Sequence, residues 1–498
     1  MNNPDYPDHI VIAGGGSAGW ISASLISHHF RHAHTRITLI ESPQIGTVGV
    51  GEGSTPHLKQ LFTTLGIEES VWMAACSATY KNGIQFEQWY KEGAPGYFHP
   101  FPSAIDHATA REFLIACERR RQGYNCTTVS DEYFLASWLT RHYKSPKTNA
   151  GEQQVAINYA YHFDAGKLAD FLRDVSVKQG VTHIQSTIDE VTRNQKGDLA
   201  TLHLANGDTI KADFFLDCTG FSSRLLQNAL EVPFVSYADS LFNDQAVAVA
   251  TGPTATPLPA TRSVAMTNGW RWEIPLTSRV GNGYVFASDF ESPEDASDRL
   301  MAQLGRKQVN ADSIRHIRIK VGRVSECWSY NCLAVGLSQG FIEPLEATAL
   351  HLVQETVEQF LSAWSAGNYS PQHQLQFNQL MADRFDGIRD YIVAHYHLSS
   401  RQGPYWNTVR HEARLSDTLQ ALLQCWQEGG NLIQFIEQEN IGHYYSPVSW
   451  YCLLSGYQLF PVLRNSESPR PPLTAIQATL TKWGARFQPH NAVLHATP

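Results

Sequence analysis

Strongly basic segments are missing from this sequence. Its 498 residues include 38 Lys and Arg against 47 Asp and Glu, so the formal net charge is -9, and no Lys/Arg run or basic stripe occurs. Proteins that bind nucleic acid usually need such a stripe to neutralise phosphates. The composition therefore argues against a nucleic-acid partner.

Paired cysteines and long apolar runs are missing as well. The eight cysteines are scattered without a CxxC pair, which predicts reduced, mostly buried thiols in a cytoplasmic protein rather than a disulfide framework or a metal site. The N-terminal residues MNNPDYPDHIVIAGGG lack a basic region, and their apolar stretch runs directly into glycines. We therefore expect neither a signal peptide nor a membrane span.

The sequence does contain a strand, turn and helix at its start. The residues HIVIAGGGSAGWISASLISHHF read as a buried strand, a glycine turn and a helix, and TRITLIES follows as a second strand that ends at Glu41. With 43% hydrophobic and 17% charged residues, the chain can bury a large core around such a unit. The opening is therefore interpreted as a βαβ unit.

The pattern continues with both helices and strands. Residues 160–180 have apolar side chains at helical spacing and are predicted to form one helix. Residues 181–220 alternate like successive strands, with turns at 196–197 and 206–208. A strand of the opening type returns at 331–341, and a helix follows it. The apolar stripe of that helix consists of Leu350, Val353, Val357, Phe360 and Trp364.

A GxGxxG motif lies between the first strand and the first helix. Backbone without side chains can approach a pyrophosphate closely, and the helix N-terminus favours the anion. Glu41 follows the last glycine by 22 residues and is placed to bind ribose hydroxyls. The predicted cofactor-binding residues of the turn are Gly14, Gly16, Ser17, Ala18 and Gly19.

Two further glycine turns favour FAD over NAD. The segment FFLDCTGFSS puts Asp217 and Gly220 at a strand end, and LAVGLSQGF puts Gly336 at another. Three turns that all hold one cofactor would require a long cofactor, which suits FAD. Each of the two further segments alone could also be an ordinary turn at a strand end. We predict an α/β fold with a Rossmann-like FAD-binding body of the flavin monooxygenase type over residues 1–364, with substrate-binding segments inserted in it. A mainly helical part, residues 365–498, is expected to complete the substrate site.

The stretch GWRWEIPL sets two tryptophans one residue apart. Trp270 and Trp272 are expected on the same face of a strand, because strand side chains alternate between faces. Two adjacent buried indoles make a stiff aromatic wall. Plain core packing is the alternative interpretation.

With these features, the chain resembles the flavin-dependent halogenases of the tryptophan halogenase family over nearly its whole length. The combination of WxWxIP with GxGxxG is highly specific for that family over its hydroxylase relatives. The motifs that carry the resemblance are GGGSAGW (14–20), GVGEGSTP (49–56), ATYKNGIQF (78–86), GWRWEIP (269–275), GFIEPLEAT (340–348) and RDYIVAHY (389–396).

The resemblance implies an enzyme that makes hypohalous acid from oxygen and chloride or bromide at reduced FAD, and that halogenates an electron-rich aromatic compound such as an indole. Lys81 matches the family's catalytic lysine, which would polarise the hypohalous acid or, if neutral, form a haloamine. Glu346 matches the catalytic glutamate, which would take the proton of the arene intermediate or assist Lys81. An acid in the first turn after Pro344 could instead complement a helix dipole.

Halide and substrate positions are implied in the same way. The backbone amides of Thr348 and Ala349 match the family's halide site. His99, Phe101 and Trp450 match positions where tryptophan halogenases sandwich an indole, with core packing as the alternative for each. The tryptophan pair would pack beside the flavin and keep organic substrate away from it.

The residues that hold the amino-acid head of the substrate in the free-tryptophan enzymes are only partly present here. Tyr444 and Tyr445 are followed by SPVS and then Trp450, so the segment holds no acid. An indole without a bound amino-acid head, or a larger indole-bearing compound, is therefore expected. No second nucleotide fingerprint for NAD(P)H is visible, and a separate flavin reductase would supply reduced flavin, as in the family. An FAD-dependent aromatic hydroxylase and a non-catalytic flavoprotein remain as alternatives.

Overall fold

The computed structural model describes residues 6–44, 51–149, 151–306, 309–464 and 473–495, so residues 49 and 50 of the GVGEGSTP motif lie outside the described part. The chain divides into two compact units that interleave along the sequence. The predicted division after residue 364 rests on a change in the residue pattern of the sequence and stays a prediction. The first unit contains residues 1–77, 163–237 and 320–386, and the second contains residues 78–162, 238–319 and 387–498.

A six-stranded sheet, mainly parallel, forms the centre of the first unit. Strand β1 (His9–Ala13) pairs in parallel with β2 (Arg36–Glu41) and with β13 (Phe214–Asp217). All five residues of β1 are buried, as expected for a central parallel strand with both faces covered. The strand order is β21-β22-β13-β1-β2-β9, with β9 at Thr182–Gln185, β21 at Trp328–Ser329 and β22 at Cys332–Ala334.

Helix α1 (Ser17–His29) packs against β1 and β2 of this sheet and contacts α6 (Ala165–Lys178) and α8 (Ala349–Ala366). The predicted βαβ opening and the predicted helix after the 331–341 strand are thereby confirmed. The single helix predicted for residues 160–180 is wrong at its start. Residues Ala160–Phe163 form strand β8, because they pair with another strand, and Asp164 caps α6 by accepting the amide of Lys167 at 3.1 Å.

The predicted strands after residue 185 are confirmed as a three-stranded antiparallel sheet of β10 (Ile188–Arg193), β11 (Leu199–Leu204) and β12 (Thr209–Ile210). A second small sheet in this unit joins β14 (Phe234–Ser236), β20 (Gly322–Val324) and β23 (Gly340–Phe341). Further elements are β3 (Glu52–Gly53), α2 (Leu58–Thr64), α3 (Glu69–Ala75) and the beginning of α9 (Gln374–His397).

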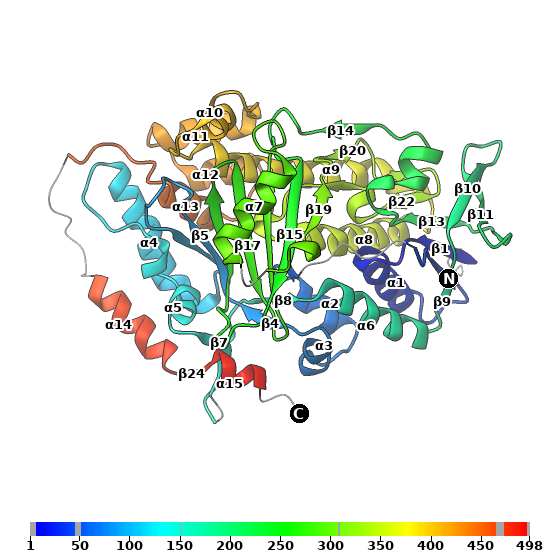
Figure 1. The fold of residues 1–498 in the computed structure, drawn as a ribbon, viewed down its shortest axis with the longest axis horizontal. Helices are drawn as coiled ribbons and strands as arrows, with labels where there is room; N and C mark the ends of the chain where they lie inside the picture. The colour runs from blue at the N-terminus through cyan, green and yellow to red at the C-terminus, as the bar shows by residue number, and fades with distance from the viewer. Residues whose placement is uncertain (1–5, 45–50, 150, 307–308, 465–472, 496–498) are drawn as a thin grey trace. The chain divides into compact units, whose positions relative to one another are not determined.

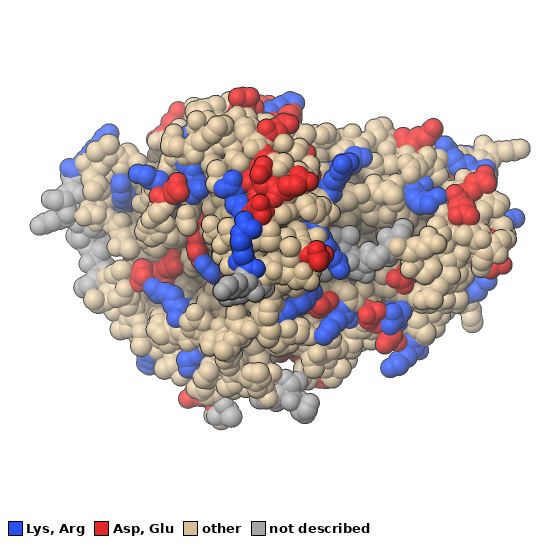
Figure 2. All heavy atoms as spheres, in the orientation of Figure 1, with Lys and Arg blue, Asp and Glu red and all other residues tan. Residues whose placement is uncertain are grey.

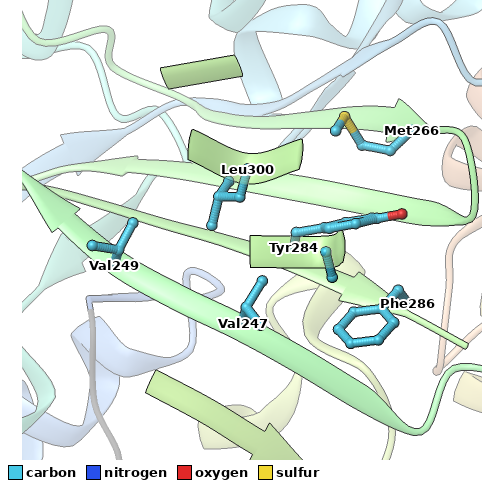
Figure 3. Close-up of a cluster of buried hydrophobic side chains, with 7 residues drawn as sticks. Val247, Val249, Met266, Tyr284, Phe286 and Leu300 are labelled. Atoms are coloured by element: carbon cyan, nitrogen blue, oxygen red, sulfur yellow. The ribbon is translucent and has the colours of Figure 1, made fainter. Parts of the chain in front are cut away.

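A seven-stranded sheet, mainly antiparallel, forms the centre of the second unit. Helix α7 (Pro293–Leu304) covers one face of it and packs against β15 and β18 (Figure 1). Figure 3 shows side chains of the core between them, including Val247, Tyr284, Phe286 and Leu300. The order is β19 (Arg315–Arg318), β15 (Gln245–Thr251), β18 (Val280–Phe286), β17 (Gly269–Pro275), β16 (Thr261–Met266), β5 (Gly83–Glu87) and β6 (Tyr97–Pro100), with β16 and β5 parallel.

Helices make up most of the rest of the second unit, and the predicted helical C-terminal region is confirmed. Short strands accompany them: β4 (Thr79–Lys81) pairs with β8, and β7 (Lys144–Thr148) forms a two-stranded sheet with β24 (Phe487–Pro489). The helices are α4 (His107–Arg121), α5 (Leu135–Arg141), α10 (Pro404–His411), α11 (Asp417–Gln427), α12 (Leu432–Gln438), α13 (Pro447–Gly456), α14 (Leu473–Gly484) and α15 (His490–His495).

None of the eight cysteines, all of which lie in the described part of the chain, is joined in a disulfide bond. Within the described segments, none of the helices combines the length and apolar character needed to cross a bilayer. Acidic and basic side chains lie intermixed on the face that Figure 2 displays.

Candidate active site

The three predicted glycine turns meet in the first unit. Gly14 has a φ of 113°, and a Cβ there would lie 2.1 Å from the carbonyl oxygen of Cys218, so only glycine lets the first turn approach β13 this closely. Gly336, with a φ of 70°, packs against the first turn of α1, since a Cβ on it would lie 2.8 Å from the Cβ of Ala18. The hydroxyl of Ser338 donates to the carbonyl oxygen of Gly220 at 3.1 Å, which joins the second turn to the third.

Asp217 organises these turns from inside. Its fully buried carboxylate accepts the amide and hydroxyl of Thr219, at 3.0 and 2.6 Å, and the amides of Leu225 and Leu226, at 2.9 and 2.8 Å. The hydroxyl oxygen of Ser338 also lies 3.0 Å from Asp217, so its one hydrogen is shared between this carboxylate and the carbonyl oxygen of Gly220. Because these donors occupy the carboxylate, Asp217 fixes the conformation of the turns that hold Gly220 and Gly336.

Glu41 lies where the sequence placed it, at the end of β2 beside the glycine turn. Its carboxyl covers the backbone of Gly15, where a Cβ would lie 2.2 Å from the glutamate Cδ, and it lies 3.0 Å from Nε2 of His183. A Cβ on Gly16 would meet no atom within 4 Å, so space remains beside the turn.

Sequence reasoning missed Glu52 of β3, a half-buried acid whose pKa is raised to about 7 by desolvation.

Glu346 precedes α8 rather than lying in it. Residues Pro344–Glu346 form a short 3-10 turn, and Ala347 then adopts a left-handed conformation with a φ of 56° before α8 begins at Ala349. Glu346 is buried. The helix-dipole alternative is weakened, because that effect acts mainly within the first turn. The amides of Thr348 and Ala349 stand at the amino end of α8, where helical amides have no intrahelical acceptor.

A histidine pair that the sequence analysis did not identify follows one turn later on α8. The ring of His351 stacks on the ring of His57, with centroids 4.6 Å apart, and its Nδ1 lies 3.3 Å from Oγ1 of Thr55. Burial lowers the pKa of His351 to about 3, so this imidazole is neutral at physiological pH. No spacing rule in the sequence indicates this pair.

In the second unit, the structure brings Lys81 together with Phe101. Lys81 ends β4 and is fully buried, and its Nζ lies 5.6 Å from the centroid of the Phe101 ring. Ala160 lies opposite Lys81 in the pairing of β4 with β8. The small side chain of Ala160 leaves room for the lysine on that face, because paired residues project to the same side of a sheet.

Tyr391 connects the two other predicted substrate residues. Its ring centroid lies 6.0 Å from that of His99 and 4.8 Å from that of Trp450, and it stacks on Tyr445 at 3.6 Å with an interplanar angle of 7°. All four side chains are buried. Tyr391 belongs to the motif RDYIVAHY, but the sequence gives no sign of which rings it contacts.

A pocket lies beside this aromatic cluster. Its lining includes the carboxylate of Asp390, whose Oδ1 accepts hydrogen bonds from Arg389 at 2.8 and 3.0 Å and whose Oδ2 accepts the hydroxyl of Ser416 at 2.6 Å. The guanidinium therefore neutralises this acid. The lining consists of Gly387, Asp390, Thr418, Leu419, Leu422, Ile441, Tyr444, Tyr445 and Trp450.

The tryptophan pair lies on one face of β17, as predicted. The ring centroids of Trp270 and Trp272 are 6.0 Å apart, and both side chains are buried. The indole of Trp272 lies over Gly283 of β18, where a Cβ would be 2.0 Å from the ring. Trp89 extends the wall, with its centroid 6.2 Å from that of Trp270. The pair is therefore held rigidly by the strands on which it sits.

A sequence model of the family described as tryptophan halogenase matches residues 9–467. This chain belongs to the tryptophan halogenase family. Membership confirms the predicted enzyme class, a flavin-dependent halogenase, and does not favour the hydroxylase alternative. The chain is 35% identical to tryptophan 6-halogenase SttH of Streptomyces toxytricini, over 91% of this chain and 90% of the relative.

Solved structures of halogenases share the fold. A flavin-dependent halogenase from Xanthomonas campestris matches with a TM-score of 0.85 and 31% identity, over 98% of each chain. MibH, a lathipeptide tryptophan 5-halogenase, matches with a TM-score of 0.86 and 27% identity, over 100% of this chain and 94% of the other. The predicted α/β fold class is thus confirmed for this member of the tryptophan halogenase family.

Besides these predicted residues, this halogenase holds a buried histidine behind the Lys81 strand. His490 is fully buried, its Nε2 accepts the amide of Tyr80 at 3.3 Å, and its Nδ1 lies 2.9 Å from the carbonyl oxygen of Pro257. Both contacts are satisfied by a neutral ring that carries its proton on Nδ1. Burial lowers the pKa of His490 to about 4, against the opposing effect of its bond to Pro257.

His490 should make the folded halogenase less stable in acid. As the pH is lowered from 6.5 to 4, the unfolded chain takes up a proton at this residue and the folded chain does not. The free energy of unfolding should therefore decrease by about 3 kcal/mol over this range because of this group. Above pH 6.5 its contribution is complete. Urea unfolding across this range should therefore show a smaller pH dependence for His490→Gln than for the wild type, whereas exposed His34→Gln should change nothing. Parallel curves for wild type and His490→Gln would refute the assignment.

Proposed function

We propose that this protein uses reduced FAD, oxygen and chloride or bromide to make hypohalous acid, and halogenates an indole that lacks a charged amino-acid head or a larger indole-bearing compound. The observation that carries the proposal is the buried Lys81 ammonium beside Phe101, in a unit whose other aromatic cluster contains His99 and Trp450. A cation that points at an aromatic site can hold a small oxidant and direct it at a ring carbon.

The glycine turns of the first unit fit FAD. The close approach of the turn at Gly14 to β13, the space beside Gly16 and the contact of Gly336 with Ala18 support a pyrophosphate held against the backbone. Glu41 is proposed to bind ribose hydroxyls. When bound and reduced, FAD supplies the two electrons that, with oxygen, convert halide into hypohalous acid. A separate NAD(P)H-dependent flavin reductase is proposed to deliver it.

The remaining chemistry belongs to residues of the chain. The amides of Thr348 and Ala349 are proposed to hold the halide. Lys81 either donates a hydrogen bond to the hypohalous acid or carries the halogen as a haloamine. The ring carbon then bonds to the halogen, the oxygen leaves as water, and Glu346 takes the proton that the ring carbon loses. Trp270 and Trp272 are proposed to keep the aromatic substrate away from the flavin, so that oxygen is not transferred directly.

The absence of a charged head on the substrate is proposed from the pocket around Trp450. An α-amino acid needs a partner for its ammonium, because an unpaired buried charge carries a large penalty. The carboxylate of Asp390 is already paired with Arg389 and Ser416, and the ring of Tyr445 is stacked on Tyr391. SttH is named for tryptophan and MibH for a peptide, so relatives accept the indole in different settings.

Indole should therefore be halogenated faster than free tryptophan. Equal concentrations of the two would compete in one reaction with enzyme, flavin reductase, FAD, NADH and either chloride or bromide, and mass spectrometry would quantify both products. We expect the indole product to dominate in each halide and the halogen mass to follow the halide supplied.

Two outcomes would separate errors in this proposal. If tryptophan is preferred by tenfold or more, the enzyme is a halogenase but the substrate assignment is wrong, and other residues bind the amino-acid head. If products gain oxygen and no halogen, the halogenase chemistry itself is wrong.

A further inference from the structure

A histidine outside the predicted site ties the Lys81 strand to the large sheet of the second unit. His162 of β8 is fully buried and lies opposite Thr79 of β4. Its Nδ1 lies 3.2 Å from Oγ1 of Thr79, and its Nε2 lies 2.9 Å from Oγ1 of Thr261 on β16. One imidazole therefore bridges the short strand that carries Lys81 and the seven-stranded sheet.

A further contact sets the direction of these hydrogen bonds. The hydroxyl of Thr79 donates to the carbonyl oxygen of Pro275 at 2.7 Å, so its oxygen accepts from the imidazole. His162 therefore carries its proton on Nδ1 and accepts at Nε2 from Thr261. Burial, followed by the nearby Lys81 and His490, lowers the pKa of His162 well below 6.5, in agreement with a neutral ring. The hydrogen bonds are therefore donated in one direction. Thr261 of β16 donates to His162 of β8, His162 donates to Thr79 of β4, and Thr79 donates to the carbonyl oxygen of a residue of β17.

The strand register shows what this chain of hydrogen bonds holds in place. Thr79 and Lys81 are two residues apart on β4 and project to the same face. Thr261 pairs with Ile84 of β5, and Ile84 pairs with His99 of β6, so Thr261 and His99 belong to one row across the sheet. The link through His162 therefore connects the strand of Lys81 to the sheet of His99.

We propose that His162 is a positioning residue for Lys81, an inference that rests on the function proposed above. It acts through Thr79 rather than on the substrate. Strand β4 has only three residues, and the lysine side chain is long and flexible, so the place of the ammonium depends on where β4 is held. A misplacement of about 1 Å in such a group can lower a rate by up to about 10²-fold.

The test is the fate of the oxidant in three variants. His162→Leu removes both bonds of the imidazole, Thr79→Val removes the hydroxyl at nearly constant volume, and His162→Gln keeps polar atoms near both threonines. The amount of halogenated indole is divided by the hypohalous acid that monochlorodimedone captures in a parallel reaction. We expect this ratio to fall roughly tenfold in His162→Leu and in Thr79→Val, with an unchanged KM for indole. His162→Gln should recover part of the ratio.

His9→Leu is the matched control. His9 is a buried histidine of the first unit with the same kind of link, since its Nε2 lies 2.9 Å from Oγ1 of Thr38 and its Nδ1 lies 2.8 Å from the carbonyl oxygen of Lys211. This variant should lower the unfolding temperature and leave the ratio unchanged, because lost stability reduces product and captured oxidant together.

Each result decides the inference. A wild-type ratio in folded His162→Leu overturns it, and if that variant does not fold, the ratio in Thr79→Val decides alone. Lys81→Ala is measured in the same series. If it loses product while the His162 and Thr79 variants behave as wild type, only the positioning role is wrong. If Lys81→Ala keeps its product, the proposed role of Lys81 fails, and the positioning role of His162 fails with it.

Discussion

Lys81→Met should abolish halogenation while FAD binding and hypohalous acid formation persist. The side chain is fully buried and its Nζ lies 5.6 Å from the centroid of Phe101. Methionine preserves most of the volume and removes the only part that can hold the oxidant, and a buried cation is replaced by an apolar group, which folding tolerates. We expect product to fall by roughly 10³-fold or more, since both orientation and polarisation of the oxidant are lost. Mass spectrometry of the product, capture of the oxidant by monochlorodimedone and an FAD titration would check the three parts.

Lys147→Met is the matched control for this variant. Lys147 belongs to the same unit, and its Nζ lies 4.7 Å from the centroid of Tyr159 and donates to the hydroxyl of that residue at 2.6 Å. Lys147 therefore also lies over an aromatic ring, but no chemical role is proposed for it. Product should be retained in Lys147→Met. Unchanged product in Lys81→Met would remove Lys81 from the mechanism, and an equal loss in both variants would point to folding.

The parts of the fold that the sequence predicted are those with local causes. The turn at Gly14 follows from glycines between an apolar strand and a helix, and α8 follows from its apolar stripe. Strand β8 was missed because its conformation is set by pairing with β4, and His162 lies 83 residues from Thr79. The apolar residues of such a short segment fit a helix or a strand equally well.

The residues of the candidate site also fall into those that local sequence motifs indicate and those that only long-range contacts reveal. Motifs indicated Lys81, Glu346 and the tryptophan pair, because each lies in a short and distinctive run of residues. Tyr391, Asp390 and His162 could not be found in that way. Their importance comes from contacts with rings, a guanidinium and hydroxyls on other elements, and neither periodicity nor local spacing carries that information.

Glu346→Gln should lower the turnover of folded enzyme by roughly 10² or more, the usual scale for the loss of a positioned acid or base. The amide keeps the shape of the side chain but cannot take the proton of the arene intermediate. Glu346 lies in the 3-10 turn before Ala347, outside the first turn of α8, so its loss should have little effect on the helix. Turnover per folded molecule and thermal unfolding would be measured on the same sample, with hypohalous acid capture to show that oxidant still forms.

Glu343→Gln separates a chemical role from a merely electrostatic one. Glu343 is a second buried acid, three residues before Glu346 and close to the same helix end. If negative charge near α8 were all that mattered, both variants would lose stability to a similar degree and keep the same rate per folded molecule. The proposed proton transfer predicts instead that only Glu346→Gln is slow, with oxidant production intact. Equal rates in the two variants would assign both acids to stability and leave the arene proton to solvent.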